Sequence, residues 1–365
     1  MNTRPVIESP SEHAALSVTF NSDASRFVVG LDSGFCIFVT NTCQIQTARV
    51  FNAGLGLVQM MGNANYLALV GGGRSPKFPE NKVIIWDDSK GKIALEIATL
   101  TAVRGVQISK SRIAVVLQNS VRVYAFHKPP QSIAKYETAD NFHGLCCLTE
   151  KYLVFPGRTP GQVQVVHLET DSVSIIPAHS NSLRALQLSS DGETLATASE
   201  KGTIIRIFST SSCAKLAERR RGTESADIYS LRFSPSGDKL ACTSDKGTLH
   251  IFDVPHARGT NQWGILNNIP FGPFSDVYSF ASCQFETGEE PQLPANPRHP
   301  AGDHPGLGTS KPIKGVVGWV DETHLVVVGA GLDARWETFA LVDGFHHRDR
   351  QPAVLREGWK RYLGN

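Results

Sequence analysis

The chain has 365 residues, of which 41% are hydrophobic and 19% are charged, a composition typical of a globular protein rather than a disordered or fibrous one. Its formal net charge of +2 is too small for the basic surface that nucleic-acid binding needs, so no nucleic-acid partner is expected. No long apolar window occurs and residues 1–11 are polar, so we expect a cytoplasmic protein with neither a membrane span nor a signal peptide.

After a flexible N-terminal segment, residues 1–11, one pattern recurs along the chain. Two runs of β-branched and aromatic residues are joined by a short turn of Gly, Ser or Asp, which is the pattern of a β-hairpin. It occurs at residues 27–40, 67–88, 113–126, 152–168, 195–209, 240–253 and 325–341. Successive hairpins begin about 39 to 46 residues apart, as four-stranded propeller blades do, except for a last step of about 85. The sequence therefore predicts an all-β fold, a single seven-bladed β-propeller of four-stranded antiparallel blades over residues 12–365.

Two segments interrupt the repeat. Residues 286–311 are rich in Pro, Gly, Glu and His, which predicts a disordered or flexible insertion between blades six and seven rather than an eighth blade. Residues 254–279 predict a long loop of blade six with many apolar side chains and few charges. Such side chains can enter a membrane interface, the alternative being that they pack against the propeller. The candidates for membrane insertion are Trp263, Ile265, Leu266, Phe271 and Phe274.

The hairpins of blades five and six resemble each other in their polar residues. Aligned on the Lys-Gly-Thr turn and on the closing Phe, the matched pairs are Ser199 and Ser244, Lys201 and Lys246, Thr203 and Thr248, and Arg206 and His250. Hydroxyls, cations and an imidazole on neighbouring strands can hold a phosphate through charge-assisted hydrogen bonds. Two such sets predict two anion sites.

Three successive arginines, residues 219–221, lie on the connection between these two blades. Successive residues of an extended segment point to opposite sides, so we expect Arg220 to serve the blade-five set and Arg221 the blade-six set. The alternative is that the arginines form a solvated strand edge and that the turns have no role beyond ordinary turn chemistry.

Longer segments resemble a known family. Residues 217–222 and 226–231, residues 67–92 and residues 318–341 are similar to signature regions of the PROPPIN family, the phosphoinositide-binding propellers of the WIPI type. Residues 67–92 resemble the family's shorter branch, which includes the yeast homologue of swollen-vacuole proteins. The family's Phe/Leu-Arg-Arg-Gly motif corresponds to residues 219–222, where Arg219 replaces the usual apolar residue.

The resemblance implies two lipid sites for phosphatidylinositol 3-phosphate and phosphatidylinositol 3,5-bisphosphate. Site one would comprise His179, Ser182, Thr197, Ser199, Thr203, Arg206 and Arg220. Site two would comprise Arg221, Ser244, Lys246, Thr248 and His250.

The resemblance also implies a monomeric, non-enzymatic effector that is recruited to autophagic, endosomal or vacuolar membranes. The implied protein partner is a lipid-transfer protein of autophagy, which would bind the edge between blades two and three around residues 77–88. The different class of function that the residues leave open is a WD-repeat-like platform for protein interactions without lipid affinity. We find no catalytic constellation, cofactor motif or metal-ligand spacing, and the seven cysteines fit reduced thiols.

Overall fold

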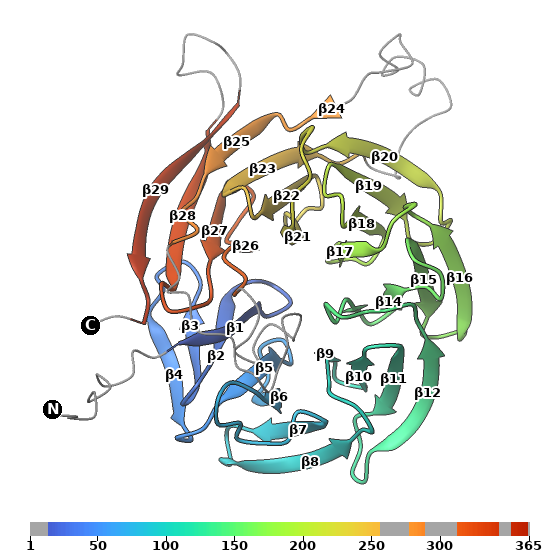
Figure 1. The fold of residues 1–365 in the computed structure, drawn as a ribbon, viewed down its shortest axis with the longest axis vertical. Helices are drawn as coiled ribbons and strands as arrows, with labels where there is room; N and C mark the ends of the chain where they lie inside the picture. Colours follow the sequence, from blue (N-terminus) through green and yellow to red (C-terminus); the bar gives the residue numbers. More distant parts are fainter. Residues whose placement is uncertain (1–13, 256–276, 289–311, 343–351, 364–365) are drawn as a thin grey trace, which may run out of the picture.

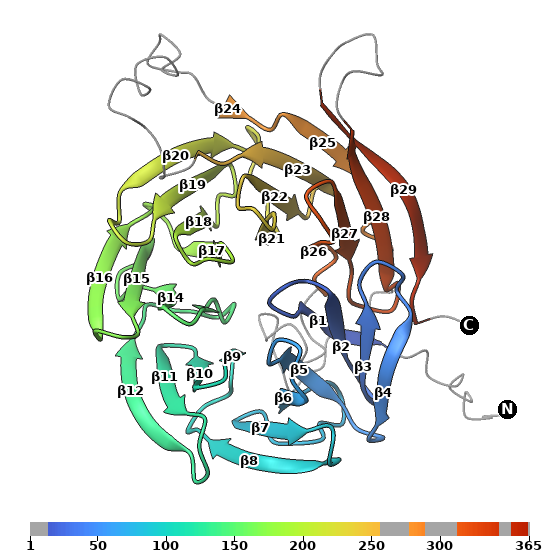
Figure 2. The same cartoon turned by 180° about the vertical axis from the view of Figure 1, so that it is seen from behind.

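The computed structural model describes residues 14–255, 277–288, 312–342 and 352–363. Seven sheets stand around a central axis, with the first strand of each sheet nearest the axis and the fourth at the rim (Figure 1, Figure 2). The predicted all-β, seven-bladed propeller is confirmed. Among the residues described, no helix is long and apolar enough to cross a lipid bilayer.

Each of the first four blades is built from consecutive strands. Blade one consists of β1 (Ala15–Phe20), β2 (Arg26–Leu31), β3 (Gly34–Val39) and β4 (Ile45–Val50). Blade two consists of β5 (Leu55–Met60), β6 (Tyr66–Gly71), β7 (Lys82–Asp87) and β8 (Lys92–Ala98). Blade three consists of β9 (Gly105–Ile108), β10 (Arg112–Leu117), β11 (Ser120–Ala125) and β12 (Gln131–Glu137). Blade four consists of β13 (Cys147–Leu148), β14 (Tyr152–Pro156), β15 (Gln162–His167) and β16 (Ser172–Pro177).

The last three blades follow the same plan, with one added strand. Blade five consists of β17 (Leu183–Leu188), β18 (Thr194–Ser199), β19 (Ile204–Ser209) and β20 (Lys215–Arg220). Blade six consists of β21 (Ile228–Phe233), β22 (Lys239–Ser244), β23 (Thr248–Asp253) and β25 (Ala281–Gln284). Blade seven consists of β26 (Val316–Trp319), β27 (His324–Val328), β28 (Arg335–Val342) and β29 (Ala353–Arg361). The short β24 (Val277–Tyr278) adds a parallel fifth strand to the edge of blade five.

The seven predicted hairpins form the second and third strands of the seven sheets. The second strands are largely buried because neighbouring blades cover both of their faces: five of the six residues of β2, from Phe27 to Leu31, are buried. The outer strands are more exposed, and the first four residues of β16 are all exposed. Burial therefore falls from the middle of each blade to its rim.

The first and last blades meet to close the ring, and none of the strands that the structure describes is exchanged between them. Blade one contains only N-terminal strands and blade seven only the last four. Phe27 and Phe38 of blade one pack in one apolar cluster with Trp336 and Tyr362 of the C-terminal part. The indole Nε1 of Trp336 donates a hydrogen bond to the carbonyl oxygen of Thr40 over 2.9 Å. Ala15 and Gly331 also form an antiparallel bridge, with backbone hydrogen bonds of 3.1 and 2.8 Å. The closure thus combines side-chain packing with one backbone bridge, and the local sequence pattern predicts neither.

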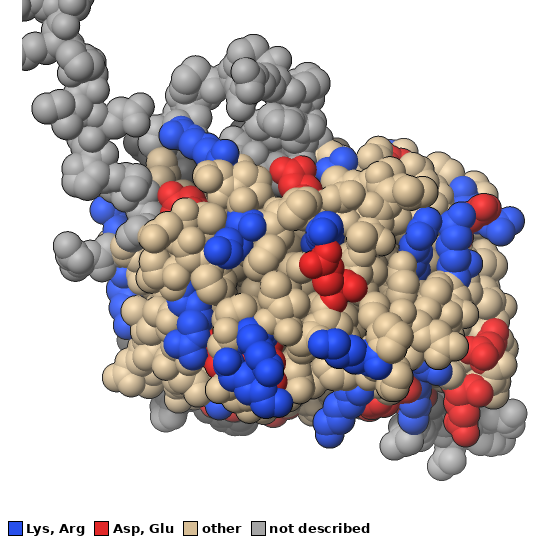
Figure 3. Space-filling view, turned by 90° about the horizontal axis from the view of Figure 1, so that it is seen from below, with Lys and Arg blue, Asp and Glu red and all other residues tan. Residues whose placement is uncertain are grey.

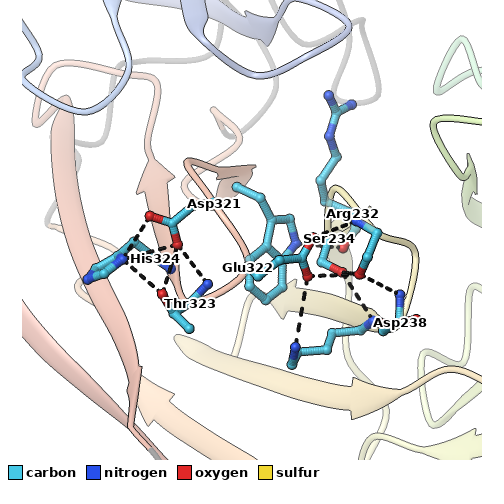
Figure 4. Close-up of polar contacts among 10 residues, drawn as sticks. Arg232, Ser234, Asp238, Asp321, Glu322, Thr323 and His324 are labelled. Carbon is cyan, nitrogen blue, oxygen red and sulfur yellow. Dashed lines mark hydrogen bonds and ion pairs between the residues drawn. The ribbon is translucent and has the colours of Figure 1, made fainter.

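Polar contacts join blades six and seven at the turns between their first and second strands (Figure 4). The carboxylate of Glu322 accepts a hydrogen bond from the hydroxyl of Ser236 over 2.8 Å, and Lys239 lies 3.9 Å from it. The indole Nε1 of Trp319 donates to the carbonyl oxygen of Arg232 over 3.0 Å. These turns lie at the opposite end of the blades from the Lys-Gly-Thr turns, so they hold the two blades in place without occupying the candidate site.

Candidate functional site

The Lys-Gly-Thr turns of blades five and six adopt the same backbone geometry. Ser199 is the last residue of β18 and Ser244 the last residue of β22. Gly202 and Gly247 follow three residues later with φ angles of 62° and 68°, in the left-handed region that favours glycine. A Cβ at Gly202 would also collide with the carbonyl oxygen of Ala226. The two turns therefore present equivalent positions at the same end of neighbouring blades.

The strand register places Arg206 and His250 at equivalent positions. Arg206 of β19 lies opposite Thr197 of β18, and His250 of β23 lies opposite Cys242 of β22. Both Thr197 and Cys242 are two residues before the serine that ends the strand. Each blade thus places one basic or imidazole side chain beside its turn.

Three of the residues expected in site one meet through short contacts. The Nε2 atom of His179 lies 2.9 Å from the hydroxyl of Thr197, which is fully buried. The guanidinium of Arg206 donates from Nε to the Glu218 carboxylate over 2.8 Å and from an Nη atom to the carbonyl oxygen of Ala178 over 2.7 Å. Ser182 and Thr203 are partly buried at the same end of blade five, and Ser199 is 7% exposed. Site one is therefore a preformed polar cluster that also contains an acidic residue.

The arginine strand has two differently occupied faces. In β20, Glu218 lies opposite Arg206 and Arg220 lies opposite Ile204, so the side chains of Glu218 and Arg220 share one face of the strand. Arg219 is on the other face, where its Nε atom donates to the carbonyl oxygen of Asp253, at the end of β23, over 3.0 Å. The unusual arginine at position 219 is thus bound to the end of a blade-six strand.

Arg221 follows Arg220 on the opposite side of the extended strand, but its guanidinium bonds to backbone oxygens rather than to the blade-six side chains expected from the sequence. Its side chain is 7% exposed, and its guanidinium donates to the carbonyl oxygens of Gly202 and Glu224. Burial lowers the pKa of His250 to about 4, and the charge of Arg221 adds to this. The hydrogen bonds run to backbone oxygens because the connection after residue 222 turns back over the guanidinium, and sequence alternation cannot predict that path.

The remaining residues expected in site two lie around the blade-six turn. The Nδ1 atom of His250 lies 3.0 Å from the hydroxyl of Ser279. The Lys246 ammonium lies 3.7 Å from the Glu224 carboxylate, and both side chains are largely exposed. Ser244 is fully buried, and the hydroxyl of Thr248 is 3.5 Å from the carbonyl oxygen of Lys246. Ser279 and Glu224 were not predicted, because both enter the site from connections rather than from the repeat.

The long blade-six loop returns beside the arginines. Its last residues form β24, where Val277 and Tyr278 pair in parallel with Arg219 and Arg220. The five residues predicted to insert into membranes, between positions 263 and 274, lie outside the described residues, as do residues 1–11 and residues 289–311 of the predicted insertion. The short β24 thus lies directly beside the arginine strand at the edge of blade five.

Both histidines are held in the neutral form near pH 7. Burial and the nearby charge of Arg206 lower the pKa of His179 to about 4. The pKa of His250 has the same value, through burial and Arg221. Each imidazole therefore offers hydrogen bonding without a positive charge, and the arginines and Lys246 supply the charge for an anion. Within the described ranges, no group of three His, Cys, Asp or Glu side chains is arranged to hold a metal ion.

Comparison with known proteins gives a consistent result. The PROPPIN family model matches residues 14–262. SVP1-like protein 2 of Emericella nidulans is 54% identical over 325 residues, which cover 84% of this chain and 99% of that protein. SVP1-like protein 2 of Neurospora crassa is 43% identical over an alignment of 427 residues that covers 100% of this chain and 99% of that protein.

Solved structures match the fold as well. Kluyveromyces lactis Hsv2 superposes with a TM-score of 0.76 at 24% identity, covering 96% of this chain and 99% of that chain. The complex of KlAtg21 with the coiled coil of AgAtg16 gives a TM-score of 0.67 at 17% identity, covering 95% of this chain and 99% of that chain.

Proposed function

This chain belongs to the PROPPIN family, a non-enzymatic family known for phosphoinositide binding and autophagy, and from that premise we propose that it binds two 3-phosphorylated inositides through sites on blades five and six. The ligands are phosphatidylinositol 3-phosphate and phosphatidylinositol 3,5-bisphosphate. The bound chain acts as a peripheral effector on autophagic, endosomal or vacuolar membranes.

The division of the arginines between two sides carries the proposal. Arg220 shares the face of β20 with Glu218, whose carboxylate holds Arg206 beside His179 and Thr197. Arg221 is on the other side of the strand and acts electrostatically on His250. Each guanidinium therefore has its own set of hydroxyl and imidazole groups, as two separate anion sites require.

Two sites on one edge would compensate for modest affinity at each. A charge-assisted hydrogen bond contributes roughly 1.5 to 3 kcal/mol, so three or four of them give affinity in about the micromolar range after desolvation. When both headgroups lie in one membrane, the second binding event is intramolecular and overall retention rises. The predicted membrane-inserting loop would add a further contact, because β24 returns it to the same edge.

The proposed protein partner is a lipid-transfer protein of autophagy, bound at the edge of blades two and three around residues 77–88. This edge lies across the ring from blade six in Figure 1. A membrane on blades five and six would therefore leave it accessible.

Flotation of the full chain with lipid vesicles tests the function. We expect the chain to float with vesicles that contain phosphatidylinositol 3-phosphate or phosphatidylinositol 3,5-bisphosphate and to remain behind with unphosphorylated phosphatidylinositol, since the sites recognise added phosphates. Equal flotation on all three compositions, or on none, would refute lipid recognition and favour the protein-interaction platform.

The acidic residue of site one gives a second test. Burial raises the pKa of Glu218, but hydrogen bonding and charge from Arg206 bring it below its ordinary value, so the carboxylate is ionised and competes with a phosphate. Glu218→Gln should therefore tighten headgroup binding roughly two- to fivefold, since a partly exposed ion pair is worth up to about 1 kcal/mol. Isothermal titration with soluble inositol 1,3-bisphosphate measures this. Glu169→Gln, an exposed position on blade four, controls for net charge, and weaker binding by Glu218→Gln would show that the carboxylate only positions Arg206.

A further inference from the structure

A cavity of about 290 Å³ lies at the edge of blade three, away from the candidate lipid sites. It opens between the connection from β8 to β9 and the turn from β10 to β11. Its polar lining residues are Thr101, Arg104, Gln118, Asn119, Ser120, Arg122 and Lys135. The β10–β11 turn joins the second and third strands of blade three, as the Lys-Gly-Thr turns do in blades five and six. The cavity and the two candidate lipid sites therefore lie at the same end of their blades.

The lining carries three cations and no acidic residue. The nearest acid in β12, Glu137, lies 3.4 Å from Arg158, toward blade four. In the described part of the chain, the Nε atom of Arg122 is buried and makes no hydrogen bond. Figure 3 views the rim near β8 and β12 and shows basic side chains spread over it. A buried guanidinium donor beside other cations is costly unless an anion completes it.

The strand register relates this cavity to site one. Arg122 lies opposite Lys135 in blade three, as Arg206 lies opposite Glu218 in blade five. Arg122 also lies opposite Val115, two residues before the end of β10, as Arg206 lies opposite Thr197 in β18. Blade three therefore repeats the central arginine of site one but replaces its acidic partner by a lysine.

The other lining groups add donors to this positive charge. An Nη atom of Arg104 donates to the side-chain oxygen of Gln118 over 3.3 Å, and its guanidinium lies 4.9 Å above the ring of Phe142. These contacts orient the guanidinium at the cavity, where hydroxyls of Thr101 and Ser120 are also present. The volume is at the lower end of small-molecule sites, about 300 to 1,000 Å³, and suits a compact anion.

From this geometry we infer that the blade-three cavity is a third anion site, which binds the phosphate groups of a phosphorylated inositol. The same chemistry is offered by a lipid headgroup and by a soluble inositol phosphate. Because blade three lies well away from blade six around the ring, a membrane bound at blades five and six need not cover it (Figure 1).

The test uses the full chain with Arg220→Thr and Arg221→Thr as background, so that the two proposed lipid sites are weakened. We expect this background to bind soluble inositol 1,3-bisphosphate in isothermal titration. Adding Lys135→Glu should place a carboxylate opposite Arg122, recreate the ion pair of blade five and weaken binding about ten- to a hundredfold, since one to two charge-assisted bonds are lost. Arg122→Gln should cause a similar loss.

Controls separate this result from loss of charge or of fold. Lys92→Gln with Lys110→Gln removes two exposed cations outside the cavity and should leave binding unchanged. Lys135→Glu should melt at or above the temperature of the background, because it adds an ion pair. In the chain that keeps Arg220 and Arg221, flotation with phosphatidylinositol 3-phosphate vesicles that falls with Lys135→Glu identifies a headgroup as the source, whereas loss of soluble bisphosphate binding with unchanged flotation identifies a soluble ligand.

Three results would overturn the inference. In the first, the background variant does not bind the bisphosphate. In the second, the variant with Lys135→Glu binds the bisphosphate as tightly as the background. In the third, the background binds hexaglutamate more tightly than the bisphosphate. The last outcome would instead assign the cavity to an acidic protein segment.

Discussion

Replacing Arg220 and Arg221 together by threonine is expected to reduce flotation with phosphatidylinositol 3-phosphate vesicles to the level seen with unphosphorylated lipid. The two side chains serve different sides of the strand, so the double variant removes the central cation of both sites at once. Each single variant should retain partial flotation, because one site remains. When both sites are weakened, the gain from binding two headgroups at once is also lost. The double variant should therefore lose more flotation than the losses of the two single variants would predict together.

Stability must be measured alongside flotation, because Arg221 also has a structural role. Its guanidinium holds the backbone of residues 202 and 224, and loss of these bonds should cost about 1 to 3 kcal/mol in the free energy of unfolding, measured in urea. Arg220→Thr should be milder, since Arg220 is only partly buried.

Arg219 provides the matched control. Its guanidinium bonds to the backbone carbonyl oxygens of Asp253 and Glu218 rather than to a side chain of either candidate site, and the resembling family motif has an apolar residue at this position. Arg219→Leu should therefore keep nearly full flotation while removing the same charge from the same strand. Flotation lost equally with Arg219→Leu, or kept by a folded double variant, would mean that the arginines act only through net charge or not at all.

The fold could be predicted because each blade repeats a local pattern. Residues 27–40 and the six related segments alternate strand, turn and strand at a regular spacing, and all seven form the second and third strands of sheets. Ring closure could not be predicted in this way. The packing of Phe27 and Phe38 against Tyr362 joins positions that are far apart in sequence, and no local signal identifies such partners.

The candidate site shows the same division between local and non-local information. Strand alternation places Arg220 and Arg221 on opposite sides, and the matched turns give Arg206 and His250 equivalent positions. The carbonyl partners of Arg221, the contact of His250 with Ser279 and the parallel pairing of β24 depend instead on the paths of connections. The sequence could have identified Glu218 as a site residue, since a residue two positions before Arg220 on one strand must share its face.

The stability of the chain should fall as the pH is lowered from 7.5 to 5.5. His179 and His250 have pKa values of about 4 in the folded chain, below the ordinary 6.5 that they regain on unfolding. Between these values the unfolded state binds more protons, so stability is fully present above about pH 6.5 and is lost as the pH falls toward 4. We expect a loss of about 1 kcal/mol per histidine at pH 5.5, allowing for solvent screening.

Urea unfolding at the two pH values, for wild type and for His179→Gln with His250→Gln, measures this contribution. Glutamine keeps a neutral hydrogen-bonding group beside Thr197 and Ser279 but cannot take up a proton, so the double variant should lose less stability than the wild type over this range. Most carboxylates remain ionised above pH 5.5, which keeps acidic residues from dominating the difference. His127→Gln, at an exposed position on blade three, should keep the pH dependence of the wild type. A double variant whose unfolding free energy still falls as steeply would mean that both imidazoles are already solvated, and the polar clusters around Arg206 and Arg221 would then be too open to serve as preformed anion sites.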